Sequence, residues 1–212
     1  MKDNQVDIRE LNLENLEEFC IDNSLPKYIA KQVFKWLWKH RVLDFDKMTN
    51  ISLRNREILK ENFIINKLNI QQEKTSSDGT VKFLFELSDS KVVEGVLIPQ
   101  LKRLTACISS QVGCSLDCSF CATGKLKFSG NLTAGQIFDQ AFLINKFCFK
   151  KFGRPLTNIV YMGMGEPLLN FKNVLLSITY ISSSEGLGMS SKRITLSTVG
   201  LPKMIKKIAD MQ

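Results

Sequence analysis

The sequence predicts an α/β fold in which a small helical domain and a short antiparallel β region precede a partial barrel of about three βα units. Three observations support this prediction. Apolar residues recur at helical spacing over about the first 65 residues, strand-like segments with turn signals follow, and strands and helices alternate from residue 104 onward. The predicted domains are residues 1–66, 67–103 and 104–212.

Three helices are expected in the first domain: Leu13–Asn23, a helix that starts near Pro26, and Leu53–Phe63. Proline is tolerated in a first helical turn because its missing N–H has no partner there anyway. The apolar face of the second helix comprises Ile29, Val33, Trp36 and Leu37. Another face carries Lys31, Lys35 and Lys39 at four-residue steps, which is typical of a solvated surface or, alternatively, of a surface that follows phosphates.

The middle region is predicted to form strands over Leu68–Glu73, Val81–Leu87 and Val92–Ile98. The first two are separated by a loop with Asp78-Gly79, a strong turn signal, so they are expected to form a hairpin.

The alternating region begins with a strand at Leu104–Ser109. The following elements are a helix at Thr133–Phe149 with Thr133 as its cap, a strand at Asn158–Met162, a helix at Lys172–Ser183, a strand at Arg193–Thr198 and a helix from Pro202. Such alternation implies parallel strands joined by crossover helices. Three βα units are far fewer than the eight of a complete barrel of roughly 250 residues. We therefore expect the chain to be the front part of a longer protein.

The composition is that of a soluble globular protein, with 44% hydrophobic and 24% charged residues. No apolar run approaches the roughly 18 residues of a membrane helix, and the polar N-terminus lacks the apolar core of a secretory signal. We expect a cytoplasmic protein with no membrane partner. The net charge of +8 favours a polyanionic partner, most simply nucleic acid, although lysine-rich surfaces also occur without one.

Four of the six cysteines fall between residues 107 and 121. Cys114, Cys118 and Cys121 have the spacing C-x3-C-x2-C, which can hold three corners of a [4Fe–4S] cluster and leave the fourth iron open for S-adenosylmethionine. The alternative is a structural zinc site that also uses Cys107. Such zinc sites usually pair two C-x2-C knuckles and only one is present, so the spacing favours the cluster.

Two later turns add possible cofactor contacts. Gly165 and Glu166 lie in Met162–Pro167, between a strand and a helix. Glycines there let the backbone approach a ligand, and Glu166 can accept a hydrogen bond from an ammonium group such as that of the methionine moiety. Ser197, at the end of the next strand, can bind the cofactor carboxylate or cap the next helix, and the sequence does not decide between the two.

Together these residues resemble one family. The segment Cys107–Gly124 resembles the cluster loop of RlmN, the bacterial radical S-adenosylmethionine (radical SAM) enzymes that methylate C2 of adenine in 23S rRNA and tRNA. Met162–Asn170 and Ile194–Gly200 resemble its later motifs, and the order of the parts resembles that family over the whole chain. The resemblance implies that the third domain is the first half of a radical SAM partial barrel.

The resemblance implies a role for each candidate residue. The cluster ligands would be Cys114, Cys118 and Cys121, and the contacts to S-adenosylmethionine would be Gly165, Glu166 and Ser197. Glu94 matches the proton-accepting glutamate of the family, whereas without the resemblance it would be interpreted as a solvent-facing strand residue. Cys107 matches a cysteine that forms a disulfide with a catalytic cysteine near the C-terminus of the family.

The resemblance also implies partners: 23S rRNA and tRNA, an electron donor such as flavodoxin or ferredoxin, and a monomeric enzyme. No cysteine follows Cys148, so the methyl-carrying cysteine of the family is missing and we expect this chain to be inactive alone. Three alternatives stay open: the related Cfr resistance enzymes, which methylate adenine C8, a radical initiator with another substrate, and a non-catalytic RNA-binding module stabilised by zinc.

Overall fold

The computed structural model describes residues 5–116 and 118–211, and it forms two compact units. The first comprises the chain up to Lys67 together with Ser183–Gly188, and the second comprises Leu68–Ser182 and the chain from Met189. The expected mixture of helices and strands is confirmed. Among the described residues, no helix has the length and apolar character needed to cross a membrane.

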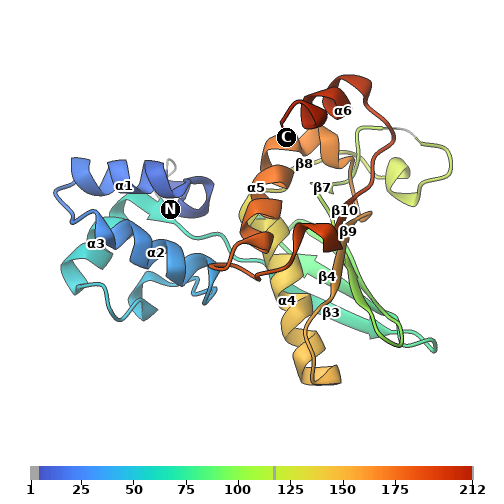
Figure 1. Ribbon diagram of the computed structural model, residues 1–212, viewed down its shortest axis with the longest axis horizontal. Helices are drawn as coiled ribbons and strands as arrows, with labels where there is room; N and C mark the ends of the chain where they lie inside the picture. The colour runs from blue at the N-terminus through green and yellow to red at the C-terminus, as the bar shows by residue number, and fades with distance from the viewer. Residues whose placement is uncertain (1–4, 117, 212) are drawn as a thin grey trace. The chain divides into compact units, whose positions relative to one another are not determined.

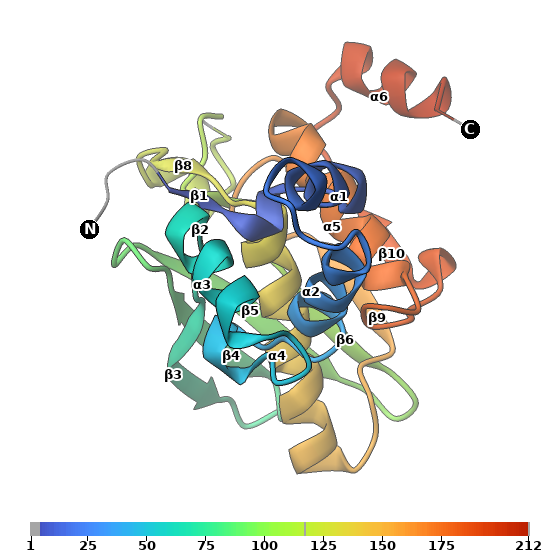
Figure 2. The same cartoon turned by 90° about the vertical axis from the view of Figure 1, so that its left-hand side faces the viewer.

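Three helices make up most of the first unit: α1 (Leu13–Asp22), α2 (Tyr28–Trp38) and α3 (Leu53–Asn62) (Figures 1 and 2). The short strands β1 (Val6–Asp7) and β2 (Phe63–Ile64) pair in parallel beside them. The side chain of Asn12 caps α1 by accepting a hydrogen bond from the Asn15 N–H at 2.8 Å. The three predicted helices are thus present, with bounds within a few residues of those expected.

The core of this unit corrects the predicted apolar face of α2. Ile29, Val33 and Leu37 are buried as expected, but Trp36 is only half-buried and the fully buried indole belongs to Trp38. The Trp36 N–H donates a hydrogen bond to Asn50 Oδ1 at 2.5 Å. An indole whose N–H has a partner near the surface remains at the edge of a core.

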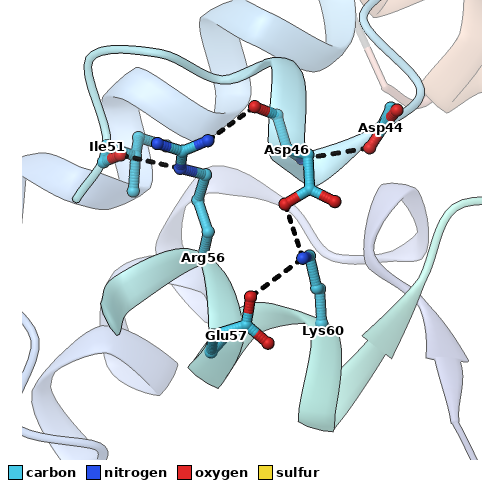
Figure 3. Close-up of polar contacts among 6 residues, drawn as sticks. All are labelled: Asp44, Asp46, Ile51, Arg56, Glu57 and Lys60. Atoms are coloured by element: carbon cyan, nitrogen blue, oxygen red, sulfur yellow. Dashed lines mark hydrogen bonds and ion pairs between the residues drawn. The ribbon is translucent and has the colours of Figure 1, made fainter. Parts of the chain in front are cut away.

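Polar contacts fix the loop between α2 and α3, as Figure 3 shows. The Arg56 guanidinium donates to the carbonyl oxygens of Ile51, at 2.9 Å, and of Asp46, at 2.5 Å. Lys60 forms ion pairs with Asp46 at 2.5 Å and Glu57 at 2.9 Å, and these two carboxylates raise the pKa of Lys60. The second half of the loop, from Asp46 to Ile51, is therefore held to α3.

The second unit is built on one six-stranded sheet with the order β10-β9-β6-β5-β4-β3. The strands are β3 (Asn69–Thr75), β4 (Val81–Glu86), β5 (Val92–Pro99), β6 (Leu104–Cys107), β9 (Asn158–Tyr161) and β10 (Ile194–Leu196). Neighbours from β3 to β6 are antiparallel, whereas β6, β9 and β10 run parallel. The hairpin strands and the first strand of the alternating region therefore share one sheet.

Two long helices cover one face of this sheet (Figure 1). They are α4 (Ala134–Phe152) and α5 (Phe171–Ser182). The ring of Phe147 on α4 meets that of Phe83 on β4 at 5.1 Å between centroids, and Ser177 on α5 shares a 2.7 Å hydrogen bond with the Tyr161 hydroxyl on β9. Thr133 caps α4 as predicted, in a reciprocal pair with Gln136.

The other face of the sheet carries the half-buried residues of the same strands. In β5 and β6 the side chains alternate, so that Val93, Leu97 and Ala106 are fully buried while Glu94 and Cys107 point to the opposite side. The functional candidates on the strands therefore lie on the face that α4 and α5 leave open.

Candidate functional site

The cysteine loop leaves the sheet after β6 and is closed at its neck by a short ladder. The strands β7 (Gln111–Val112) and β8 (Gly130–Asn131) pair antiparallel at this neck. Gly113 has φ +73°, and a Cβ atom there would meet the Lys127 carbonyl oxygen at 2.2 Å. Only glycine fits where the two arms of the loop cross so closely.

The three cysteines of the spacing motif are half-buried free thiols in this loop. The backbone turns tightly around them, with the Cys121 N–H donating to the Cys118 carbonyl at 3.0 Å and the Leu116 N–H donating to Cys114 Sγ at 3.4 Å. All three line one cavity of about 310 Å³. Among the described residues, which exclude Asp117 of this loop, no three Cys, His, Asp or Glu side chains are arranged closely enough to hold a metal ion.

The turn Met162–Pro167 forms the wall opposite the cysteines in the same cavity. Gly165 has φ +94°, and a Cβ atom there would meet the Gln111 side chain at 2.4 Å. This contact places Gln111 Oε1 where it accepts a 2.9 Å hydrogen bond from the Glu166 N–H. The backbone of the turn is thereby fixed to the root of the cysteine loop.

Glu166 is 5% exposed, and both of its carboxylate oxygens accept backbone hydrogen bonds. Oε1 accepts from the Leu168 N–H and Oε2 from the Val199 N–H, each at 2.9 Å. The carboxylate therefore caps the short helix at Pro167–Asn170 and ties it to the loop after β10. Each oxygen keeps a second lone pair that can accept a hydrogen bond from a ligand.

Ser197 follows β10 and lines the cavity beside Glu166. It does not cap the next helix, α6 (Pro202–Ala209), whose cap position is Leu201 and lacks a side-chain hydrogen bond. Of the two interpretations that the sequence left open, the structure thus removes the cap and places Ser197 in the lining of the cavity.

Glu94 and Cys107 lie next to this cavity on the open face of the sheet. Val96 pairs with Cys107 across β5 and β6, and Glu94, two residues before Val96, projects on the same side. Glu94 lines a second cavity of about 470 Å³ together with Met164, whose neighbours Gly163 and Gly165 line the first. Burial raises the pKa of Cys107, and the N–H of Met162 partly offsets this.

Lys82 is a residue of this region that the sequence interpretation missed. Its Nζ lies 3.0 Å from Glu94 Oε1, with the two side chains 56% and 46% exposed. The signal was present in the second and third predicted strands, because Lys82 on β4 and Glu94 on β5 lie on the same face of neighbouring strands. The cross-strand register that joins them was not fixed by sequence alone.

The expected disulfide is not supported, because all six cysteines of the chain are free. Cys20 and Cys148 are fully buried, as expected of small apolar side chains. Cys107 lies beside β9, and burial there raises the pKa of its thiol, which favours the neutral form. Its sulfur has no disulfide partner.

The donor set fits a thiolate-ligated cluster by its chemistry. Three free thiols from one loop line a cavity that also exposes a carboxylate and a hydroxyl for a second ligand, and the described lining contains no lysine or arginine that would compete for the thiolates. The arrangement is open rather than a preformed cage, since the described thiols do not yet converge on a single point.

Comparisons with known proteins agree with these features. A family model described as "Ribosomal RNA large subunit methyltransferase N-terminal domain" matches residues 6–65. A protein of Christiangramia forsetii, named "Probable dual-specificity RNA methyltransferase RlmN", is 52% identical over 210 residues, which are 99% of this chain and 60% of the relative. The "Dual-specificity RNA methyltransferase RlmN" of Buchnera aphidicola is 41% identical over 208 residues, covering 98% of this chain and 57% of the relative.

Among solved structures, a radical SAM methyltransferase from Sphaerobacter thermophilus superposes with a TM-score of 0.83 at 36% identity. The match covers 96% of this chain and 60% of that one. The chain thus spans about 60% of the length of the relatives it matches. With this similarity extending from the first helical unit to the loop after β10, the chain belongs to the RlmN family.

Proposed function

We propose that this chain carries the cofactor-binding part of a radical SAM methyltransferase that methylates C2 of adenine in 23S rRNA and tRNA. One observation carries the proposal: a single cavity brings together residues from three separate motifs. They are Cys114, Cys118 and Cys121 from the loop after β6, Gly165 and Glu166 from the turn after β9, and Ser197 from the loop after β10. All three motifs follow parallel strands at their carboxyl ends, where α/β folds bind ligands.

In this proposal Cys114, Cys118 and Cys121 hold a [4Fe–4S] cluster. When bound, the cluster supplies the electron that cleaves S-adenosylmethionine and so begins radical chemistry. The cysteine loop supports this role because its neck is fixed by β7 and β8 while its thiols stay free and half-buried. An electron donor such as flavodoxin or ferredoxin would deliver that electron at the exposed side of the loop.

The wall opposite the cysteines would hold S-adenosylmethionine. Glu166 would accept a hydrogen bond from its ammonium group with the lone pairs that Leu168 and Val199 leave unused. Ser197 would donate to its carboxylate, and the backbone at Gly165 would lie against it because no side chain intervenes. These contacts would orient the ligand in the cavity.

The target adenine would enter the second cavity, where Glu94 would accept the proton that leaves C2. The Ser109 hydroxyl supports the position of Glu94: it donates to the Glu94 carbonyl at 2.6 Å and accepts from the Met164 N–H at 2.8 Å. Cys107 would present its thiol on the same face of the sheet. Lys82 would neutralise the Glu94 carboxylate until substrate displaces one of the two side chains.

The three predicted domains have corresponding roles in the proposal. Residues 1–66 would contact RNA, residues 67–103 would supply Glu94, and residues 104–212 would form the first part of a partial radical SAM barrel. We further propose that the enzyme acts as a monomer in the cytoplasm.

Anaerobic reconstitution with iron and sulfide tests the proposal. The chain should bind about four irons, turn brown, and release 5′-deoxyadenosine from S-adenosylmethionine when a strong reductant is added. The matched variants are Cys114→Ala, Cys118→Ala and Cys121→Ala, which should each lose the colour and the product. Cys148→Ala serves as the control, because Cys148 is buried away from the cavity and should retain both.

A colourless protein that binds one zinc per chain instead would refute the proposal and support the zinc-stabilised module. Because this chain lacks the methyl-carrying cysteine, the site of methylation is tested with the chain joined to the C-terminal part of an RlmN relative, by mass spectrometry of an adenine-bearing RNA treated with this reconstituted protein. Formation of 2-methyladenosine supports the assignment, and formation of 8-methyladenosine alone would contradict it.

A further inference from the structure

The first unit contains a cavity of its own, of about 310 Å³, that no step proposed above uses. Its lining consists of Lys31, Gln32, Lys35, Trp36, His40 and Asn50. The first five belong to α2 or directly follow it, and Asn50 comes from the loop before α3. The described lining combines two cations, two aromatic rings and two amides, and it includes no acidic residue.

The aromatic wall of this cavity is held in place. The Trp36 and His40 rings lie 5.2 Å apart between centroids, tilted by 54°. The Trp36 N–H is fixed by Asn50 Oδ1, and the loop that carries Asn50 is attached to α3 through Arg56 and its two carbonyl acceptors (Figure 3). A half-buried indole fixed in this way offers a rigid apolar surface to a flat ligand.

Gln32 supplies an independent indication of a ligand. Its Oε1 is buried and has no hydrogen-bond partner within the described part of the chain. Buried amide oxygens nearly always accept a hydrogen bond, and Gln32 lines the cavity. Rotation of its side-chain amide toward the cavity would bring this enclosed oxygen to a ligand that supplies an N–H group. The exocyclic amino groups of adenine, cytosine and guanine are donors of this kind.

The charges of the cavity favour phosphate. Lys31 and Lys35 are exposed, and neither has a carboxylate partner among residues 5–116 and 118–211. Their neighbours on the same unit are engaged, since Lys27 pairs with Glu17 at 2.9 Å and Lys39 with Glu185 at 3.7 Å. The stripe of Lys31, Lys35 and Lys39 is therefore not uniform: within the described part of the chain Lys39 has a carboxylate partner, whereas the two lysines that line the cavity have none.

We propose that this cavity binds one unpaired nucleotide of an RNA. The base stacks on Trp36 beside His40, its amino group donates to Gln32 Oε1, and the adjoining phosphates contact Lys31 and Lys35. Base–aromatic stacking with a basic rim is how proteins bind single-stranded nucleic acid. The choice of RNA rather than another polyanion rests on the function proposed above, whereas the nucleotide itself is argued from the cavity.

The test uses the fluorescence of Trp36. The chain has two tryptophans, and Trp38 is 1% exposed, so a stacked base reaches only Trp36. Titration with an unstructured RNA oligomer should quench the emission, whereas a fully paired duplex of equal length should not. Trp36→Phe should abolish the quenching but keep binding by anisotropy, and Trp36→Ala should weaken binding about 5- to 150-fold.

A second test changes the lysines of the cavity and leaves Trp36 in place, so it does not depend on whether the Trp36 variants fold. Lys31→Met with Lys35→Met should lower the slope of log affinity against log salt by about 1.4, from two lost phosphate contacts on a single strand. Lys102→Met with Lys150→Met makes the same change of charge at exposed sites outside the cavity and should leave affinity for the oligomer within about twofold. Circular dichroism should be the same for all these variants.

Three outcomes would overturn the inference. They are unchanged Trp36 emission on RNA binding, equal salt slopes for the two double variants, and equal quenching by adenosine monophosphate, which would assign the cavity to a free nucleotide. If any of them occurs while the reconstituted chain still cleaves S-adenosylmethionine, this inference fails and the proposed function stands. If the chain binds no iron–sulfur cluster but RNA still quenches Trp36, the proposed function fails and the inference about the cavity stands.

Discussion

The turn at Met162–Pro167 and the cysteine loop line the same cavity, but they are built in opposite ways. The turn is fixed by its neighbours: Gly165 packs on Gln111, and both Glu166 oxygens accept backbone hydrogen bonds. The cysteine loop is fixed at its neck, while its three thiols are half-buried and free. In the proposed function, this difference would mean that the wall for S-adenosylmethionine is preorganised, whereas the wall with the cysteines would be ordered by the bound cluster.

The largest expected difference between the two kinds of region is in thiol reactivity. In the metal-free chain, the half-buried Cys114, Cys118 and Cys121 should be alkylated at least about 1,000-fold faster than Cys20 and Cys148, which react only after an opening whose free energy approaches that of global unfolding. A time course of iodoacetamide labelling followed by peptide mass spectrometry measures these rates. Equal protection of the loop thiols would show that the loop is already closed.

Cys107 should fall between these two groups. The thiolate is the reactive form, and burial raises the pKa of Cys107 above its ordinary value of 9.0. At pH 8 the thiolate fraction of Cys107 is smaller than that of a thiol with the ordinary pKa, so Cys107 should be alkylated more slowly than the loop thiols. Its alkylation rate should keep increasing as the pH rises past 9.0. A rate that levels off below this pH would contradict the stated effect of burial.

The second largest effect should follow from breaking the preorganised turn with Gly165→Ala. The new Cβ atom adds a clash with Gln111 to the cost of φ +94°, so unfolding free energy should fall by about 2–5 kcal/mol. Gly200→Ala is the matched control, because Gly200 has φ +98° with no atom within 4 Å of the built Cβ. It should cost only about 1–2 kcal/mol. Urea denaturation measures both, and equal losses would mean that the clash is relieved.

A smaller effect is expected from Glu166→Gln. The amide keeps one acceptor and places an NH₂ group against either the Leu168 or the Val199 N–H, so one buried donor loses its partner at a cost of about 1–3 kcal/mol. Hydrogen exchange at the Val199 amide should accelerate accordingly. Glu185→Gln, which breaks a half-exposed ion pair with Lys39, should cost no more than about 1 kcal/mol and leave that amide unchanged.

The smallest effect on the metal-free chain should come from the cysteine loop itself. Cys114→Ala, Cys118→Ala and Cys121→Ala should each change the unfolding free energy by less than about 0.5 kcal/mol, since half-buried thiols with few contacts contribute little. The same variants should remove all of the stabilisation that iron and sulfide give to the unsubstituted chain. A loss near 2 kcal/mol without metal would show that the loop is preorganised after all.

The secondary structure was predictable because its signals are local. Thr133 and Gln136 cap α4, and Asp78-Gly79 closes the hairpin, as their residue types require. Trp36 was misplaced because the helical period does not tell which indole has a polar partner, and the partner, Asn50, lies on another element. The same limit hid Lys82, whose approach to Glu94 depends on strand register.

The candidate site was predictable as a set of residues but not as an arrangement. The motifs named the residues now found around one cavity, yet nothing local indicated that Glu166 would be tied to the Val199 loop or that Glu94 would line a separate cavity. These relations depend on segments more than 30 residues apart. Only the resemblance to a family suggested the role proposed for Glu94, which composition and periodicity had left as an ordinary strand residue.

The strand order β10-β9-β6-β5-β4-β3 also bears on how this unit forms during synthesis. Read from β3, each strand lies beside the strand of the same sheet that was synthesised before it, so every new strand adds to an edge that has already left the ribosome. The strand to which the next one pairs is always the strand of this sheet that was synthesised last. Pulse-labelled hydrogen exchange on stalled chains should show protection spreading from β3–β5 to β9 and β10, and the cavity would then be completed only when its last wall, after β10, has emerged.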